Sequence, residues 1–349
     1  MRSGSCCCYS EMNSISLLFI EETILLLVDD KVRANFSLCN CSKLTGNWAK
    51  IGERLLLNVY FYNIYIEPSQ SLNDVFLAIN RHNSAGSVEH LTLNGIQEHE
   101  FPRLTVFGFV AIGFYSGQQP TAPEENYTQV PLNSTFMSAL KRAFGKQMCC
   151  RLMFSMDPAV EDERHVYDRF LDILPRRFSC VTFKKSSARA AEFIIQTEQN
   201  RCIYNLELGG RWIESEKFKS FVRKFMFEKD FVRLQLDSVE EYGCTTAEVF
   251  ENLLNKWNSA PESFKWPHKS LQLPKGNVEE TAKKYAQQID PHGGYARRHR
   301  MDNSILLFHV CGANFVIPGL CVHDALSLIR TTHHLHKGAL ESHNGMKVW

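Results

Sequence analysis

Histidine, cysteine and acidic side chains supply the first candidates for chemistry in this chain. His165 and Asp168 lie one helical turn apart, and His292 begins a His-Gly-Gly sequence in a predicted loop. The sequence lacks a Gly-x-Ser-x-Gly elbow, a glycine-rich phosphate loop and a His-Glu-x-x-His motif. Because no group of these residues has the spacing that a reaction needs, we predict that the chain is not an enzyme and uses no cofactor.

Metal binding is the second chemistry that these residue types allow. Soft-metal ligands gather in the C-terminal segment: Cys311, Cys321, His323, His333, His334 and His336. Zinc ligands usually come in close pairs fixed by a turn or helix, and here only His333 and His336 have such a spacing. The twelve cysteines include no pair of C-x-x-C knuckles. We therefore predict no metal site.

Charge gives little support for a nucleic-acid partner. The strongest basic cluster is Arg297-Arg298-His299-Arg300, with Tyr295 beside it, and it could contact RNA or a phosphate. The whole chain has a formal net charge of only +1, so no long-range basic field surrounds it. We interpret the cluster as a solvated loop before a strand at 305–310, and we predict no nucleic-acid partner.

The apolar run from Ile15 to Val28 does not resemble a membrane segment. Glu21 and Glu22 interrupt it, and it has neither a basic start nor a small-residue cleavage site. Palmitoylation of Cys6-Cys7-Cys8 is an open alternative that only this weak cluster favours. We predict a cytoplasmic or nuclear protein with reduced thiols and no membrane contact.

The elements that would position any site recur along the chain. Apolar-x-apolar strands are followed by a polar or glycine turn and then by an amphipathic helix. Their first residues are Leu91, Leu152, Val181, Leu206, Leu234 and Leu271. The steps are 25 to 37 residues after a first step of 61, which predicts one more strand between Phe107 and Phe114. Units of about 29 residues, each a strand and a helix, are typical of long leucine-rich repeats.

Apolar stripes predict the helices of this array. Residues 218–225 and 249–257 carry apolar side chains at i, i+3, i+4 and i+7, and the second helix starts at Thr245-Thr246 with Glu248 after it. Two more helices are expected at 188–196 and 278–288. We expect the stripes to pack into a shared core rather than to line a cofactor pocket.

The N-terminal apolar residues predict three short helices, which would form a small bundle. The predicted organisation is a disordered leader at 1–12, a helical segment at 13–58, a β-α interaction domain at 59–310 and an atypical tail at 311–349. The fold class is therefore α/β, with a small N-terminal helical bundle followed by an irregular leucine-rich-repeat-like solenoid that has a curved sheet on one face and helices on the other.

Scattered blocks between residues 13 and 310 carry a family resemblance. They are 13–21 (NSISLLFIE), 44–51 (LTGNWAKI), 167–178 (YDRFLDILPRRF), 206–212 (LELGGRW), 231–236 (FVRLQL) and 254–257 (LNKW). The chain resembles a large nematode family of F-box-like and F-box-associated (FTH-type) proteins. That resemblance implies an N-terminal segment that docks on a Skp-type adaptor of a cullin RING ubiquitin ligase, and a C-terminal part that holds a protein substrate.

The expected adaptor-binding residues are Leu17, Leu18, Phe19, Ile24 and Trp48. The strands can present Glu207, Gln235 and Gln272 to a substrate, although the sequence does not identify which residues bind it. We therefore predict a non-enzymatic protein-protein interaction module that recruits a substrate to the ligase. The alternative is a ligase-independent repeat scaffold whose N-terminal bundle is only a structural cap.

Overall fold

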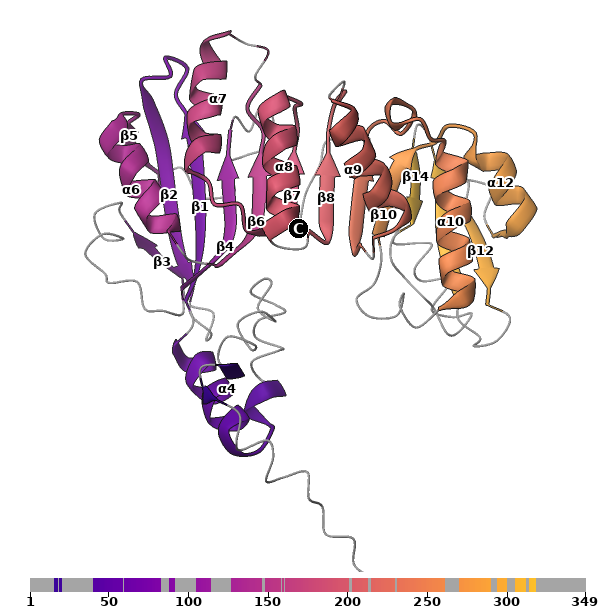
Figure 1. The fold of residues 1–349 in the computed structure, drawn as a ribbon, viewed down its shortest axis with the longest axis horizontal. Coiled ribbons are helices and arrows are strands. Elements are labelled where there is room, and N and C mark those ends of the chain that lie inside the picture. Colours follow the sequence, from indigo (N-terminus) through magenta and orange to yellow (C-terminus); the bar gives the residue numbers. More distant parts are fainter. Residues whose placement is uncertain are drawn as a thin grey trace, which may run out of the picture. The chain divides into compact units, whose positions relative to one another are not determined.

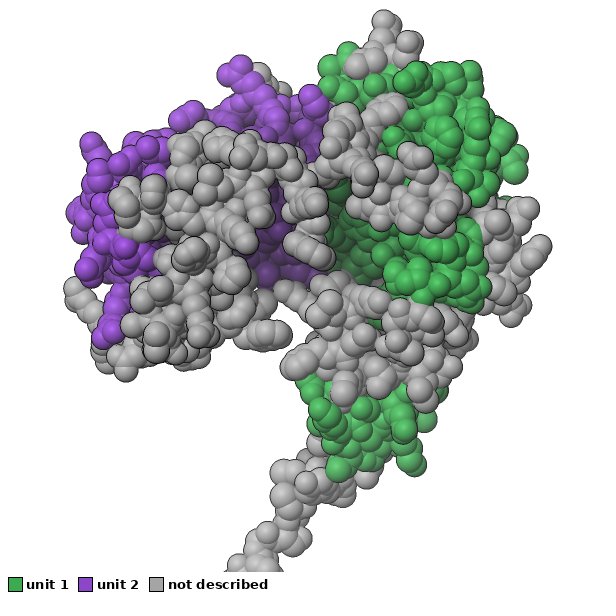
Figure 2. Space-filling view, turned by 180° about the vertical axis from the view of Figure 1, so that it is seen from behind, with its two compact units in different colours: residues 1–115, 120–180 green, residues 116–119, 181–349 purple. Residues whose placement is uncertain are grey.

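The structure, a computed structural model, forms two compact units (Figure 2). Unit 1 comprises residues 1–115 and 120–180, and unit 2 comprises residues 116–119 and 181–349. Their boundary falls within strand β7 (Phe178–Phe183). The described residues are 16, 17, 19, 20, 40–58, 60–82, 88–91, 105–113, 127–145, 148–157, 159, 161–200, 203–212, 215–229, 231–260, 270–289, 294–299, 305–311 and 314–317.

The sheet of unit 1 is open and mixed, with strand order β3-β2-β1-β4-β6 and with β5 also paired to β2. Strands β1, β4 and β6 are parallel, whereas β2 runs antiparallel to β1, β3 and β5. The strand bounds are β1 (Tyr60–Pro68), β2 (Asp74–His82), β3 (Val88–Leu91), β4 (Thr105–Ile112), β5 (Thr128–Pro131) and β6 (Met148–Phe154). Its helices α6 (Ser134–Phe144) and α7 (Glu161–Ile173) contact one another, and Tyr167 of α7 packs edge-on against Phe154 of β6.

Unit 2 also has an open, mixed sheet, in the order β11-β12-β13-β14-β10-β9-β8. Strands β8, β9 and β10 are parallel. Each neighbouring pair in the order β10-β14-β13-β12-β11 is antiparallel. The strand bounds are β8 (Asn205–Leu208), β9 (Arg233–Leu236), β10 (Ser270–Pro274), β11 (Gln287–Gln288), β12 (Gly294–Arg298), β13 (Ile305–Cys311) and β14 (Asn314–Ile317).

Helices cover one face of the unit 2 strands, where α8, α9 and α10 stand side by side in Figure 1. The helical bounds are α8 (Ala188–Asn200), α9 (Glu216–Phe227), the short 3-10 helix η2 (Glu240–Tyr242), α10 (Thr246–Ser259) and α12 (Val278–Tyr285). The second leucine of each parallel strand, at positions 208, 236 and 273, is buried. The first leucine of each strand, at positions 206, 234 and 271, is buried as well, and burial of one such side chain contributes about 1.5–3 kcal/mol.

The predicted N-terminal helical bundle is wrong. Among the described residues of 13–58, only α4 (Gly46–Asn58) is a long helix, and the other helical residues are 17, 19, 20 and 40–42. A bundle needs apolar stripes that face one another, whereas Leu17, Phe19 and Leu44 remain exposed. The remainder of the segment, including Ile24, lies outside the described residues.

The predicted leucine-rich-repeat-like solenoid is also wrong. Strands and helices do alternate, and β6, β7, β8, β9 and β10 contain the predicted apolar-x-apolar segments, while β4 supplies the predicted extra strand. However, a solenoid repeats one parallel step along its whole length, and each unit here adds antiparallel strands to a parallel group. The apolar-x-apolar pattern indicates which face of a strand is buried. It does not indicate the direction in which the next strand pairs.

Candidate functional site

The predicted adaptor-binding residues are partly described, and two of them are exposed on one turn. Leu17 and Phe19 are each 56% exposed. The hydroxyl of Ser16 accepts a hydrogen bond from the Phe19 N–H at 3.4 Å, and the Ser16 carbonyl accepts one from the Ile20 N–H at 3.1 Å. Ile20 is buried, so this turn has one inward side chain and two apolar side chains that face water.

The later part of the N-terminal segment contains one more exposed apolar residue and the predicted Trp48. Leu44 is 46% exposed, and the half-buried Trp48 has an indole N–H with no hydrogen-bond acceptor among the described residues. The side chains of Leu18 and Ile24 lie outside the described residues. We call Leu17, Phe19 and Leu44 the exposed apolar trio.

The residues predicted to face a substrate lie in one row across the parallel strands of unit 2. Glu207 of β8 is in register with Gln235 of β9, and Gln235 is in register with Gln272 of β10. Side chains alternate along a strand, so this polar row points away from the buried leucines on either side of it. The structure therefore brings the three residues together.

One arginine bonds to two residues of the polar row. Arg233 Nε donates to the Glu207 carboxylate at 2.8 Å, and its Nη2 donates to the Gln235 amide oxygen at 3.2 Å. Glu207 is buried, and Gln235 and Gln272 are half-buried. The bond from Arg233 to Glu207 therefore connects β9 to β8 and occupies part of the row.

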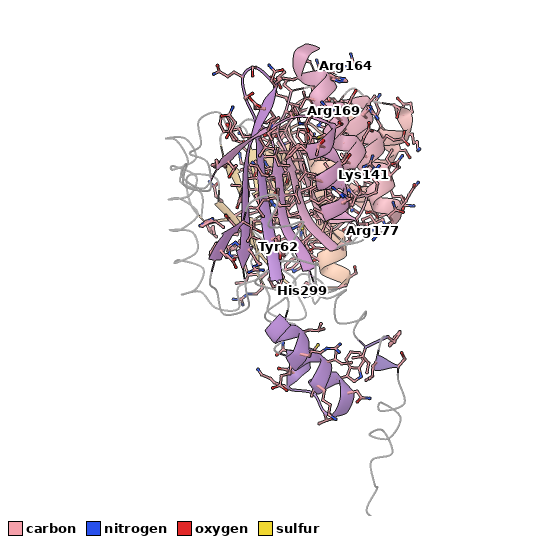
Figure 3. The ribbon with its side chains drawn as sticks, turned by 90° about the vertical axis from the view of Figure 1, so that its left-hand side faces the viewer. Tyr62, Lys141, Arg164, Arg169, Arg177 and His299 are labelled. Carbon is pink, nitrogen blue, oxygen red and sulfur yellow. The ribbon has the colours of Figure 1, made fainter. Side chains whose placement is uncertain are left out.

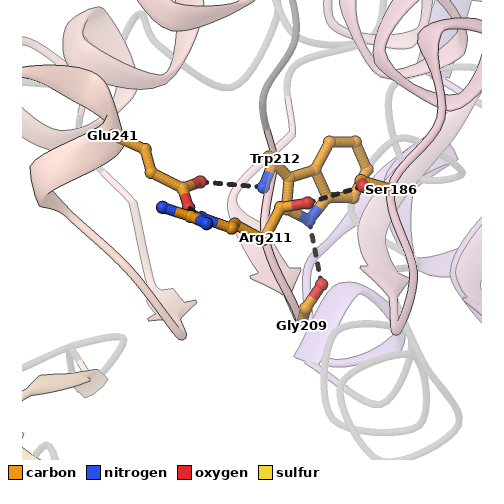
Figure 4. Close-up of polar contacts among 5 residues, drawn as sticks. All are labelled: Ser186, Gly209, Arg211, Trp212 and Glu241. Atoms are coloured by element: carbon orange, nitrogen blue, oxygen red, sulfur yellow. Dashed lines mark hydrogen bonds and ion pairs between the residues drawn. The ribbon is translucent and has the colours of Figure 1, made fainter.

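A hydrogen-bonded cluster in unit 2 joins the segments that follow β7, β8 and β9 (Figure 4). The carboxylate of Glu241 accepts the backbone N–H of Trp212 at 2.8 Å and the Nε–H of Arg211 at 2.9 Å. The Trp212 indole donates to the Gly209 carbonyl at 2.9 Å, and the Ser186 hydroxyl donates to the Arg211 carbonyl at 2.6 Å. These bonds fix η2 against the loop that follows β8.

The same loop needs a glycine. Gly210 has a φ of +73°, a conformation that other residues rarely adopt, and its N–H donates to the Asp237 carboxylate at 2.7 Å. Asp237 directly follows β9, so the turn after β8 is bonded to the turn after β9. The short η2 is therefore held in place by hydrogen bonds to the neighbouring loop.

The fixed η2 forms one wall of a groove, and α9 forms the other. A hollow of about 590 Å³ lies between them, and an adjoining hollow of about 390 Å³ extends to α10. Both hollows are lined by Arg223, Phe227 and Gly243. We call these two adjoining hollows the helix groove. The sequence pattern predicted the apolar stripe of α9, and it gave no signal for η2, which a tertiary contact holds in place.

The helix groove has charged walls and an apolar patch. Its lining includes three basic side chains, all from α9, and six glutamates. The basic residues are Lys219, Arg223 and Lys224; the acidic residues are Glu216, Glu228, Glu240, Glu241, Glu248 and Glu251. Phe227 and Tyr242 supply the aromatic surface. Such a lining can hold a segment that has both charged and apolar side chains.

Cys244 lies at the end of the groove next to α10, and its environment makes it a poor nucleophile. Burial raises the pKa of the Cys244 thiol above its usual range, while Arg223 lowers it to a smaller extent and Glu248 raises it. The thiolate is the reactive form, so a raised pKa keeps this residue inert. Cys41, Cys149, Cys150 and Cys180 are buried thiols as well.

The other chemical candidates are not brought together. His165 is exposed on α7, and no group of three potential metal ligands occurs among the residues that the structure describes. The metal-ligand candidates from Cys321 onward lie outside them. In the basic cluster, Arg297 and Arg298 end β12 rather than lying in a loop, and Arg300 lies outside the described residues. Arg297 lies 5.5 Å from the Tyr285 ring, and His299, directly after the strand, is buried against Trp257.

Basic side chains also project from the helices of unit 1. Figure 3 shows Lys141 of α6 and Arg164 and Arg169 of α7 on the side that carries these helices, with Arg177 beyond the end of α7. Glu163, Asp168 and Asp172 are interspersed on α7. The mixed signs give this face no uniform charge, so it offers no clear anion-binding surface.

Comparisons with protein-family models, with curated proteins and with solved structures found no match to this chain. None of the helices in the described part of the chain combines the length and the apolar character that a membrane span requires.

Proposed function

We propose that this chain is a non-enzymatic protein-interaction module that recruits a substrate to a cullin RING ubiquitin ligase in the cytoplasm or nucleus. The family resemblance suggests the ligase, and the exposed apolar trio is the observation that carries the proposal. Only five large apolar side chains of the described residues are exposed, and three of them, Leu17, Phe19 and Leu44, belong to the segment that resembles an F-box. A Skp-type adaptor is the partner that this resemblance implies.

The energetics of the trio suit a docking contact. Burial of a Leu or Phe side chain contributes about 1.5–3 kcal/mol, which is the size of an interface hot spot. The turn that holds Leu17 and Phe19 is bonded at Ser16 and anchored by the buried Ile20, so these side chains lose little freedom on binding.

Binding to a purified Skp-type adaptor tests the proposal. We expect the full chain to bind it, and we expect Leu17→Asp with Phe19→Asp to weaken the affinity at least about tenfold, because two carboxylates would enter an apolar contact. Val88→Asp is the matched control, since Val88 is a 48% exposed apolar residue of β3. Calorimetry gives the affinities, and circular dichroism checks the fold.

Two results would contradict the proposal. One is an absence of binding by the wild-type chain, and the other is equal binding by the double variant and the Val88→Asp control. Either would favour the alternative function, a binding protein that acts without a ligase. The helix groove favours that alternative as a second candidate, since it lies in unit 2 and involves no residue of the N-terminal segment.

A further inference from the structure

The helix groove has an excess of negative charge that its own contacts do not remove. Two of its basic side chains are paired along α9, Lys219 with Glu216 at 2.8 Å and Lys224 with Glu228 at 3.9 Å. Among the acidic side chains, Glu241 is held by Arg211, and Glu248 closes the start of α10. Glu240 and Glu251 make no ion pair with any described residue, and the only charge interaction of Glu251 seen among them is a longer-range one with Lys284.

The dimensions of the groove suit an extended segment of protein. Helix α9 has 12 residues, so a groove along it is about 18 Å long at 1.5 Å per residue. An extended chain rises about 3.3 Å per residue, and about five residues would therefore fit. The two hollows share Arg223, Phe227 and Gly243, so one segment can pass from the first to the second.

The shared residues indicate how such a segment would be held. Phe227 is half-buried and offers an aromatic surface to an apolar side chain. Arg223 makes no ion pair among the described residues, and its five N–H donors can bond to the carbonyl oxygens of a passing backbone. Gly243 has a φ of +69° and no side chain, which leaves the middle of the groove open.

We infer that the helix groove binds an extended protein segment that carries Lys or Arg together with an apolar residue. The basic side chains would pair with Glu240 and Glu251, and the apolar one would pack on Phe227. This inference rests on the proposed function, because it identifies the surface of unit 2 that would hold the substrate protein. It also gives the chemical class of the sequence that the substrate presents.

Selection of peptides on the full chain tests the inference. Phage-displayed random 12-residue peptides are selected on the wild-type protein, and the best peptide is then measured by fluorescence anisotropy. We expect selected peptides to contain Lys or Arg beside an apolar residue. We also expect Glu240→Gln with Glu251→Gln to weaken the affinity about tenfold, and an increase in salt to weaken wild-type binding. Glu280→Gln is the control, since Glu280 is exposed on α12 and lines neither hollow.

Each other outcome would overturn the inference: no enriched peptide, enrichment of neutral or acidic peptides, or equal affinity for the groove variant and the Glu280→Gln control. The adaptor measurement separates this failure from failure of the proposed function. A chain that binds the adaptor through Leu17 and Phe19 but selects no basic peptide keeps the ligase role and loses only this groove. A chain with the opposite pattern keeps the groove and loses the ligase role.

Discussion

The cluster around Trp212 shows how strongly the stabilisation from a polar contact depends on the solvent exposure of its partners. Glu241 makes two hydrogen bonds, one to the buried backbone N–H of Trp212 and one to the guanidinium of Arg211. The Glu241 side chain is 13% exposed, whereas that of Arg211 is 77% exposed. The ion pair between them is therefore largely solvated, and the bond to Trp212 carries most of the stabilisation.

Replacement of the two partners of this ion pair should have unequal effects. Glu241→Ala leaves the Trp212 N–H without its acceptor, and we expect it to lower the free energy of unfolding by about 1–3 kcal/mol. Arg211→Ala removes only the exposed partner, and we expect a loss of less than about 1 kcal/mol. Urea denaturation measures both values. Equal losses would show that the ion pair, not the backbone bond, stabilises this loop.

Exposed charges on α12 illustrate a second effect at the residue scale. Hydrogen bonds from Lys275 and Lys283, together with their charges, lower the pKa of Glu279 to about 2 from an ordinary value of 4.5. Because the folded pKa is the lower one, this carboxylate favours the folded chain above about pH 4.5, and the preference is lost as the pH falls through about 2.

Carbon-13 NMR titration of the Glu279 carboxyl group checks this assignment. We expect the midpoint near pH 2 to return toward 4.5 when Lys275→Ala and Lys283→Ala are combined. Lys284→Ala serves as the control, because Lys284 interacts with the Tyr285 side chain instead. A midpoint that stays near pH 2 in the double variant would contradict the assignment.

At the scale of elements, the start of α10 shows what a sequence pattern can resolve. Two adjacent threonines and Glu248 predicted a capped start without distinguishing the threonines. In the structure Thr245 is the cap: its hydroxyl accepts the Glu248 N–H at 3.2 Å, and Glu248 accepts the Thr245 N–H at 2.7 Å. The Thr246 hydroxyl instead donates to the Pro274 carbonyl at 2.7 Å, which connects α10 to the end of β10.

The cap gives a direct test of this element. We expect Thr245→Ala to lower the free energy of unfolding by about 1 kcal/mol, and Thr245→Ser to have little effect, because serine keeps the acceptor oxygen. Denaturant titration monitored by circular dichroism measures the difference. A loss for Thr245→Ser as large as that for Thr245→Ala would show that the methyl group, rather than the cap, is responsible.

Local periodicity predicted helices and strands well and long-range arrangement poorly. The stripe of Phe218, Val222 and Phe225 lies on α9, and the leucine pairs lie on β8, β9 and β10, as predicted. The antiparallel hairpins β1-β2, β12-β13 and β13-β14 lie outside the strand-helix pattern that the sequence analysis followed, and η2 is held by contacts that are remote in the sequence. The helix groove was missed for the same reason, since one wall is held by the bonds of Glu241 to Arg211 and Trp212.

At the scale of the whole molecule, each unit combines a well-paired strand group with strands that have less support. In unit 1, β1 pairs on both sides, whereas the exposed β3 is the last strand of the order. In unit 2, β9 pairs on both sides and buries Leu234 and Leu236, whereas β11 has only two exposed residues. Local opening should therefore differ strongly within each unit.

Hydrogen exchange measured by NMR tests this gradient. We expect the amides of Leu234 and Leu236 in β9 to exchange slowest in unit 2, and those of Gln287 and Gln288 in β11 to exchange at least about a hundredfold faster, since breaking few contacts exposes them. The same order is expected for β1 over β3 in unit 1. Slower exchange in β3 or β11 than in the doubly paired strands would contradict the pairing.

The buried cysteines have a consequence for the way in which motions of this chain can be followed. Cys149 and Cys150 lie in β6, and Cys244 lies beside the helix groove, all without a disulfide. Neighbouring strand residues point to opposite faces, so Cys149 and Cys150 report on the two sides of the same strand. Each thiol is shielded from a labelling reagent until its surroundings open. The rate of thiol modification in the native chain therefore measures local opening in unit 1 and at the helix groove, and no added probe is needed.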